Sequence, residues 1–179
     1  LNFCGQGHAE TQQVQDFPIF NGKYSPTCYI DETLHALNDM YEKRQLNSIK
    51  HLRSLRALFL HRPYRRMPET GFAVSYLFAL GKGNAKDQAE LASYCYEAGI
   101  DADTLLLEMV SQPDIPSFAE PERHQFEAYP MAMAVLRAFR ASHYYRHEIL
   151  DKLRLGSDTM LDLGNLYTAA LPAWMAAGF

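Results

Sequence analysis

The chain has 179 residues, and its balance of 47% hydrophobic to 21% charged residues is that of one folded domain, which excludes a disordered tail or a fibre. A net charge of -4 argues against a protein that holds nucleic acid by bulk positive charge. The three cysteines are odd in number and widely spaced, so they predict neither a disulfide framework nor a zinc site and favour a reducing cytoplasm. The longest apolar stretch, Phe72 to Leu80, is about half the length that a bilayer span requires.

The N-terminal part is predicted to be extended and the remainder helical. Residues 1–30 contain several Gly and Pro residues and little hydrophobic periodicity, so we expect an extended segment that lies over the following domain. Because the chain begins at Leu1 without a leader, we also expect it to be a piece of a longer protein. Asp31 can cap a helix whose apolar side chains recur at three-and-four spacing: Leu34, Leu37, Met40 and Tyr41.

Two apolar segments lie on either side of Pro63. The stripe from Ile49 to Phe59 predicts a second amphipathic helix, which Pro63 ends soon afterwards. The residues between Pro68 and Gly81 are almost uniformly apolar, and this predicts a helix that is buried on most sides. We expect that helix to form the core of the domain.

The next two helices have clear boundary signals. Asn84 followed by Asp87 predicts a helix N-terminus, and Gly99 predicts its end. Asp101 is expected to cap the following helix, which ends before the proline-rich residues 112–121, a predicted surface connector.

The C-terminal third is predicted to be helical as well. Residues 122–142 read as a helical region that is broken or kinked at Pro130, and a last helix is expected from Ser157 or Asp158 to about Gly178. The side chains expected to face inward in the first of these regions are Met133, Leu136, Ala138 and Phe139. No segment shows strand-length alternation or a tight hairpin turn. We therefore predict an all-α fold, with residues 31–179 forming a single compact domain of about six to eight helices.

Charge is segregated along the chain, and this is its most informative feature. The segment from Lys43 to Pro68 carries eight cations and no carboxylate: Lys43, Arg44, Lys50, Arg53, Arg56, Arg62, Arg65 and Arg66. The segment from Glu97 to Glu127 carries eight acids and one cation: Glu97, Asp101, Asp103, Glu108, Asp114, Glu120, Glu122 and Glu127, with Arg123.

The cations favour a docking surface. On a helix, Lys50, Arg53 and Arg56 would share one face, because they recur every three residues. The proline-bounded loop that follows holds Arg62, Arg65 and Arg66. Their guanidinium groups can form bidentate hydrogen bonds with carboxylates or phosphates. We predict that these six residues bind acidic, Glu-rich segments of a partner protein. The alternative interpretation is a solvated face that the acidic segment balances in the folded protein.

Catalytic and metal-binding patterns are weak. His143 and His147 stand at helical spacing beside Glu148, which is half of a metal site, and a metal-dependent helical enzyme built around them is one alternative. Arg140 and Arg146 flank Tyr144 and Tyr145, so this segment could clamp nucleic-acid bases, but packing at a helix junction is the favoured interpretation. Neither a nucleophile motif nor a phosphate loop is present. We predict a non-enzymatic protein without a metal or a cofactor.

Several segments together resemble one known family. They are the basic run Arg56–Tyr64, the apolar run Phe72–Ala79, the polar turn at Asn84, Lys86, Asp87 and Ala89, the pair Ala128-Tyr129 leading into the apolar helix Ala134–Arg140, and the aromatic-rich end Tyr167–Trp174. In this order they resemble the cytoplasmic domain of the DotM/IcmP/TrbA family, components of the coupling complex in type IVB secretion and conjugation. Two regions depart from that pattern: the residues after Ala141 and residues 1–45.

The resemblance implies a scaffold or receptor module of a coupling complex. Its partners would be acidic signals on secreted proteins and other subunits of the complex. It also implies a cytoplasmic domain of an inner-membrane protein, anchored through N-terminal helices that precede this segment. Arg53, Arg56, Arg65 and Arg66 lie in the corresponding basic region. The competing class is a nucleic-acid-binding accessory protein that uses the same arginines on phosphates.

Overall fold

The computed structural model describes residues 24–62, 66–111, 115, 126–157 and 169–178, and every regular element in these ranges is a helix. They form eight helices when the continuous run from His143 to Leu153 is counted once, so the predicted all-α fold is confirmed. None of the described helices is long and apolar enough to cross a membrane. Most of the predicted extended segment, most of the predicted connector and the first part of the last predicted helix lie outside the described residues.

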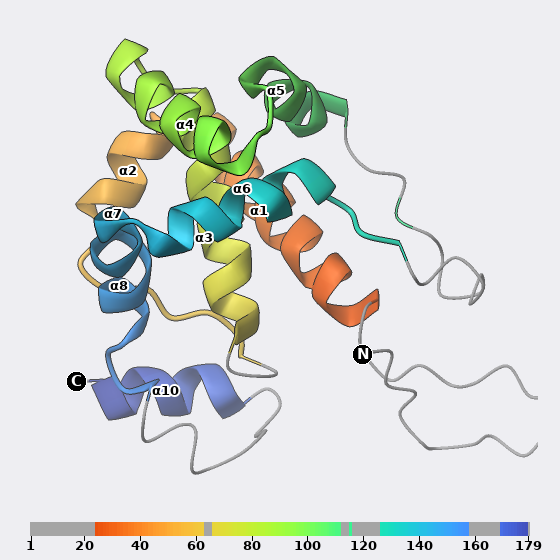
Figure 1. Cartoon of the computed structure of the whole chain (residues 1–179). Helices are drawn as coiled ribbons and strands as arrows, with labels where there is room; N and C mark the ends of the chain where they lie inside the picture. The colour runs from red at the N-terminus through yellow and green to blue at the C-terminus, as the bar shows by residue number, and fades with distance from the viewer. Residues whose placement is uncertain (1–23, 63–65, 112–114, 116–125, 158–168, 179) are drawn as a thin grey trace, which may run out of the picture.

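Helix α3, Arg66–Gly81, lies in the middle of the domain (Figure 1). Every residue from Gly71 to Leu80 is buried, as the uniformly apolar sequence predicts. Ser75 is a polar residue within this buried stretch. Its hydroxyl has a hydrogen-bond partner in the same helix, because Oγ donates to the carbonyl of Gly71 at 2.8 Å. Helices α1, α2, α4 and α6 each pack against α3.

Helix α1, Tyr24–Arg44, begins earlier than the predicted cap at Asp31. Pro26 lies in its first turn, where the missing N–H would have no helical acceptor, so the proline does not prevent helix formation. The buried side chains of α1 follow one stripe that packs along α3: Thr27, Ile30, Leu34 and Tyr41. Residues 24–30 are therefore helical rather than extended.

Helix α2, Ser48–Ser54, ends earlier than predicted. Asn47 caps its start, since its Oδ1 accepts from the backbone N–H of Lys50 at 3.0 Å. The backbone is extended at Leu55, and Leu58 donates its N–H to the carbonyl of Lys152 at 2.8 Å. The predicted helix through Phe59 is wrong beyond Ser54, because the apolar side chains of this segment pack against the core from an extended chain.

Helices α4, Ala85–Ala98, and α5, Ala102–Ser111, have the predicted boundaries. Asn84 and Asp87 form a reciprocal capping box at the start of α4. Gly99 ends α4 with φ = 67°, a left-handed conformation that glycine adopts without steric cost. Asp101 caps α5, since its Oδ2 accepts from the N–H of Thr104 at 2.9 Å.

Helix α6, Pro130–Ala141, starts at the proline that was predicted to break or kink a longer helix. Residues 126–129 are not helical. Glu108 of α5 supplies the cap, because its two carboxylate oxygens accept from the N–H groups of Met131 at 2.9 Å and Ala132 at 2.8 Å. Of the side chains predicted to face inward, Leu136 and Phe139 are fully buried and the other two are partly buried.

The sequence analysis missed one helical run, which follows α6 directly. It consists of α7, His143–Tyr145, the π-helical turn η2, Arg146–Leu150, and α8, Asp151–Leu153. Ser142 caps the run, because its Oγ accepts from the N–H of Tyr145 at 3.2 Å.

Helix α10, Ala170–Gly178, lies at the end of the molecule away from α4 and α5 (Figure 1). Trp174 is its anchor: the indole is 1% exposed, packs edge-on against Phe59 and donates to the carbonyl of Leu155 at 2.5 Å. Gly156, with φ = 68°, permits this close approach, since a Cβ there would lie 2.8 Å from the backbone of Gly178.

Replacing Glu108 with Ala should destabilise the fold by about 1 to 2 kcal/mol, because two partly buried N–H groups at the start of α6 lose their acceptors. The measurement is the free energy of unfolding from urea titration. Glu97→Ala, an exposed acid at the end of α4, is the matched control and should change stability by less than about 0.5 kcal/mol. Equal effects of the two changes would contradict the capping role.

Candidate functional site

The cations predicted to form one docking surface have different environments in the structure. Lys50 is exposed on α2, whereas Arg56 is exposed beyond the end of α2 and so does not share a helix face with Lys50 and Arg53. Arg66 is exposed at the start of α3, and Arg65 lies outside the described residues. The predicted set is therefore not one continuous face in the described part of the chain.

Arg53 belongs to an internal network. Its Nη1 lies 2.5 Å from Asp87 Oδ1 and its Nη2 lies 2.9 Å from Glu90 Oε2, while Nε donates to the hydroxyl of Tyr76 at 3.2 Å. The Asp87 side chain is only 4% exposed. These contacts join α2 to α4 across α3, so Arg53 has a structural role and its guanidinium is already occupied.

The pKa shifts of Asp87 and Arg53 agree with this structural role. Burial acts to raise the pKa of Asp87, but the N–H of Asn84 and the guanidinium of Arg53 outweigh it, and the pKa is lowered from its ordinary value. The pKa of Arg53 is raised although burial opposes its charge, because Tyr76 and the carboxylates accept its hydrogen bonds. Both groups are charged at neutral pH.

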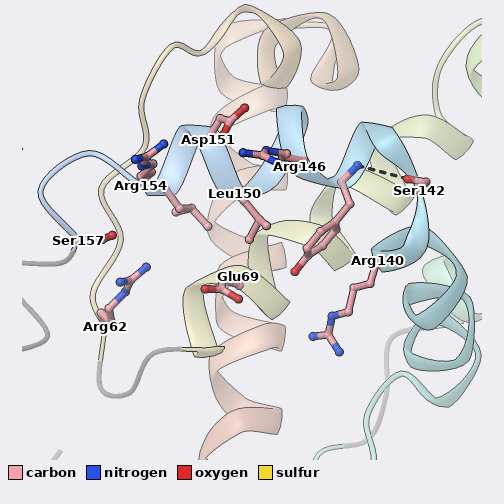
Figure 2. A pocket seen from close by; sticks show the side chains of 11 residues that line it. Arg62, Glu69, Arg140, Ser142, Arg146, Leu150, Asp151, Arg154 and Ser157 are labelled. Atoms are coloured by element: carbon pink, nitrogen blue, oxygen red, sulfur yellow. Dashed lines mark hydrogen bonds between the residues drawn. The ribbon is translucent and has the colours of Figure 1, made fainter.

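Arg62 lies on the wall of a cavity of about 380 Å³ next to the α7–η2–α8 run (Figure 2). Its guanidinium stacks over the ring of Trp174 at 4.4 Å, which fixes its position by a cation–π contact. We call this cavity the arginine pocket. Its lining consists of Arg62, Glu69, Arg140, Ser142, Tyr145, Arg146, Leu150, Asp151, Leu153, Arg154 and Ser157.

The missed helical run supplies five of the eleven lining residues that the structure describes. Arg146, Leu150 and Arg154 recur every four residues, so the π-helical turn and the residue after α8 present them on the same side. Arg140 reaches the pocket from the end of α6 and donates to Thr70 Oγ1 at 3.0 Å. Four arginines from three separate segments therefore meet around one cavity.

The lining has an excess of positive charge. Among the lining residues that the structure describes, four arginines face two carboxylates, and their formal charges sum to +2. Glu69 lies in the first turn of α3, where the helix dipole stabilises it, and Asp151 Oδ2 lies 3.3 Å from His147 Nδ1. Within the described part of the chain, Arg140, Arg146 and Arg154 form no ion pair. Their charge is available to an anion.

Tyr145 supplies a neutral hydroxyl at the same cavity. Burial raises its pKa most, and the charge of Glu69 raises it further, while the hydrogen bond and charge of Arg140 and the charge of Arg66 act in the opposite direction. The net shift is upward, so the hydroxyl stays protonated at neutral pH. It accepts from Arg140 and keeps one proton to donate.

The two histidines considered as half of a metal site lie on the same run. The ring centroids of His143 and His147 are 4.6 Å apart, and both side chains are exposed. Among the residues that the structure describes, no group of three or more His, Cys, Asp or Glu side chains is placed to hold a metal ion. The geometry gives the metal-enzyme alternative no support.

Of the four pocket arginines, only Arg62 was predicted from the sequence to bind a partner. Arg140 and Arg146 were noted only because they flank Tyr144 and Tyr145, and Arg154 was not predicted to bind. The four-residue spacing of Arg146, Leu150 and Arg154 is the signal that could have indicated a common face.

Comparisons with protein-family models, with curated proteins and with solved structures find no match to this chain. The arginine pocket is therefore interpreted from its own geometry.

Replacing Arg53 with Ala should lower the free energy of unfolding by about 2 to 3 kcal/mol, because the buried Asp87 carboxylate loses its counter-ion. Urea titration of the variant measures the loss. Arg56→Ala removes a cation from the same stretch that makes no ion pair among the described residues, and it should change stability by less than about 0.5 kcal/mol. A stable Arg53→Ala variant would return Arg53 to the set of candidate docking residues.

The same network predicts a pH dependence. Because the pKa of Asp87 is lower in the folded than in the unfolded state, its contribution to stability is present above the ordinary Asp pKa and is lost as the pH falls below it. Between neutral and acidic pH, the free energy of unfolding from urea titration should fall less in the Arg53→Ala variant than in the wild type. Parallel pH profiles would contradict the coupling of Arg53 to Asp87.

Proposed function

We propose that this domain is a protein-interaction module that docks an acidic segment of a partner protein in the arginine pocket. The observation that supports it is the convergence of Arg62, Arg140, Arg146 and Arg154 around one cavity. Three of them form no ion pair within the described residues, so an anionic ligand can neutralise charge that the fold leaves unbalanced.

The pocket suits a carboxylate-bearing segment better than an exposed helix face does. Arg140, Arg146 and Arg154 are exposed, so each of their pairs with a carboxylate contributes only about 0 to 1 kcal/mol, and the affinity comes from several such pairs that form on one segment. Arginine also offers two parallel donors to each carboxylate. Docking by several arginines at once would therefore be tight enough to select a partner.

The nucleic-acid alternative is less well supported. A duplex or single strand is held by a stripe of cations that follows its backbone, and binding strength depends on the number of phosphates contacted. Here Glu69 and Asp151 lie inside the same cavity as the arginines, and the whole chain has a net charge of -4. Repulsion by these carboxylates would disfavour a long polyanion.

The resemblance to the DotM/IcmP/TrbA family also supports the docking of an acidic segment. The DotM/IcmP/TrbA cytoplasmic domain presents basic residues to acidic signals, and this chain would do so as a non-enzymatic receptor module of a secretion or conjugation coupling complex. The pocket arginines, rather than the full predicted set from Lys50 to Arg66, would provide the docking site.

The double change Arg146→Glu with Arg154→Glu should weaken capture of a Glu-rich peptide by about tenfold or more, because it reverses two charges of the pocket. Fluorescence anisotropy with a labelled peptide at two salt concentrations measures the affinity, and a peptide with Gln in place of Glu should not bind. Both arginines are exposed, so the helical fold and thermal midpoint should be unchanged.

The matched control is Lys50→Glu with Arg56→Glu, which makes the same charge change outside the pocket. It should retain most of the affinity. Loss of binding in this control alone would move the docking site to the face predicted from the sequence. Tighter binding of single-stranded DNA than of the peptide, with a steep salt dependence, would favour the nucleic-acid alternative.

A further inference from the structure

The geometry points to a phosphomonoester as the group that the arginine pocket accepts, and we infer that the docked segment of the partner carries a phosphorylated side chain. This inference rests on the proposed function, since it identifies which acidic group enters the pocket.

The first argument is charge. The lining residues that the structure describes have a formal charge of +2, and one carboxylate neutralises half of it. A phosphorylated side chain carries about -1.5 to -2 at pH 7, so one such group balances the lining. The electrostatic attraction to the pocket grows with the charge of the ligand and therefore favours the phosphate.

The second argument is the direction of the donors. Figure 2 shows the four arginines on different sides of the cavity, with Glu69 between them. They come from the segment after α2, the end of α6, the π-helical turn and the residue after α8. A carboxylate presents two oxygens in one plane and suits one or two arginine forks, whereas a phosphate presents three oxygens in three directions.

The third argument is the supply of a neutral donor. The Tyr145 hydroxyl retains one proton to donate, whereas the Ser142 hydroxyl accepts from the N–H of Tyr145 and is itself hydrogen-bonded to the hydroxyl of Tyr94. Both hydroxyls line the pocket beside Arg140 and Arg146. Mixed guanidinium and hydroxyl donors can satisfy more acceptor lone pairs than a single carboxylate offers.

The fourth argument is size. A cavity of about 380 Å³ is at the lower end of the range of small-ligand sites, about 300 to 1,000 Å³. It has room for one phosphorylated side chain and its immediate neighbour. It has no room for a duplex or for a folded partner domain, which would contact only the rim.

The experiment compares three synthetic peptides that differ at one central residue: serine, glutamate and phosphoserine. Their affinities for the whole chain are measured by fluorescence anisotropy. The phosphoserine peptide should bind on the order of tenfold more tightly than the glutamate peptide, and the serine peptide should bind least. The double variant Arg146→Gln with Arg154→Gln should lose this preference, while Lys50→Gln with Arg56→Gln should keep it.

Each other outcome decides a separate question. Equal affinities for glutamate and phosphoserine would overturn the phosphate inference and leave the proposed function intact. No binding of either peptide would overturn both. A preference that survives in the pocket variant, with its helical fold verified by circular dichroism, would place the phosphate site elsewhere. Inorganic phosphate should compete only weakly, and competition as strong as that of the phosphopeptide would overturn the assignment to a peptide segment.

Discussion

The burial of α3 is the constraint on which the other elements depend. A helix whose residues are apolar on every side is stable in water only when neighbours cover every side. The stretch from Gly71 to Leu80 meets that requirement because α1, α2, α4 and α6 surround it. Each covering helix needs only one apolar stripe, and the parallel stacking of Tyr76 on Phe139, with ring centroids 5.3 Å apart, shows how closely α6 approaches α3.

Around this core, internal ion pairs and caps fix how the outer elements meet. Arg53 joins α2 to α4 through Asp87, and Glu108 of α5 caps α6. Lys152 is 7% exposed, and its ammonium group donates to Glu148 and to the carbonyl of Leu52, each at 2.6 Å. Buried charges of this kind are stable only when they are paired, so they specify one arrangement of the helices more than they add to stability. Part of the charge segregation in the sequence is thus used within the fold.

The arginine pocket forms where the outer layer is least regular. A π-helical turn, the extended segment after α2 and the start of α3 meet there, and α10 holds Arg62 in place through Trp174. The irregular elements leave a cavity because they do not interdigitate as two regular helices do. The helical run also places arginines on one side of that cavity. A ligand bound there would contact residues from four segments and would be sensitive to any change in their packing.

The fold class, the central helix and the boundaries of α4 and α5 could be predicted from the sequence, because uniform apolarity, a capping box and a left-handed glycine are local signals that act within one or two turns. The sequence did not determine the end of α2 or the run from His143 to Leu153. The apolar residues after Ser54 fit a helical stripe, but a long-range hydrogen bond to Lys152 and packing against Trp174 favour an extended chain. Which cations lie close together could not be predicted in this way, because proximity between residues far apart in the chain depends on how the helices pack around α3. That packing places Arg53 against the carboxylates of α4 and brings Arg62 beside Arg140, Arg146 and Arg154.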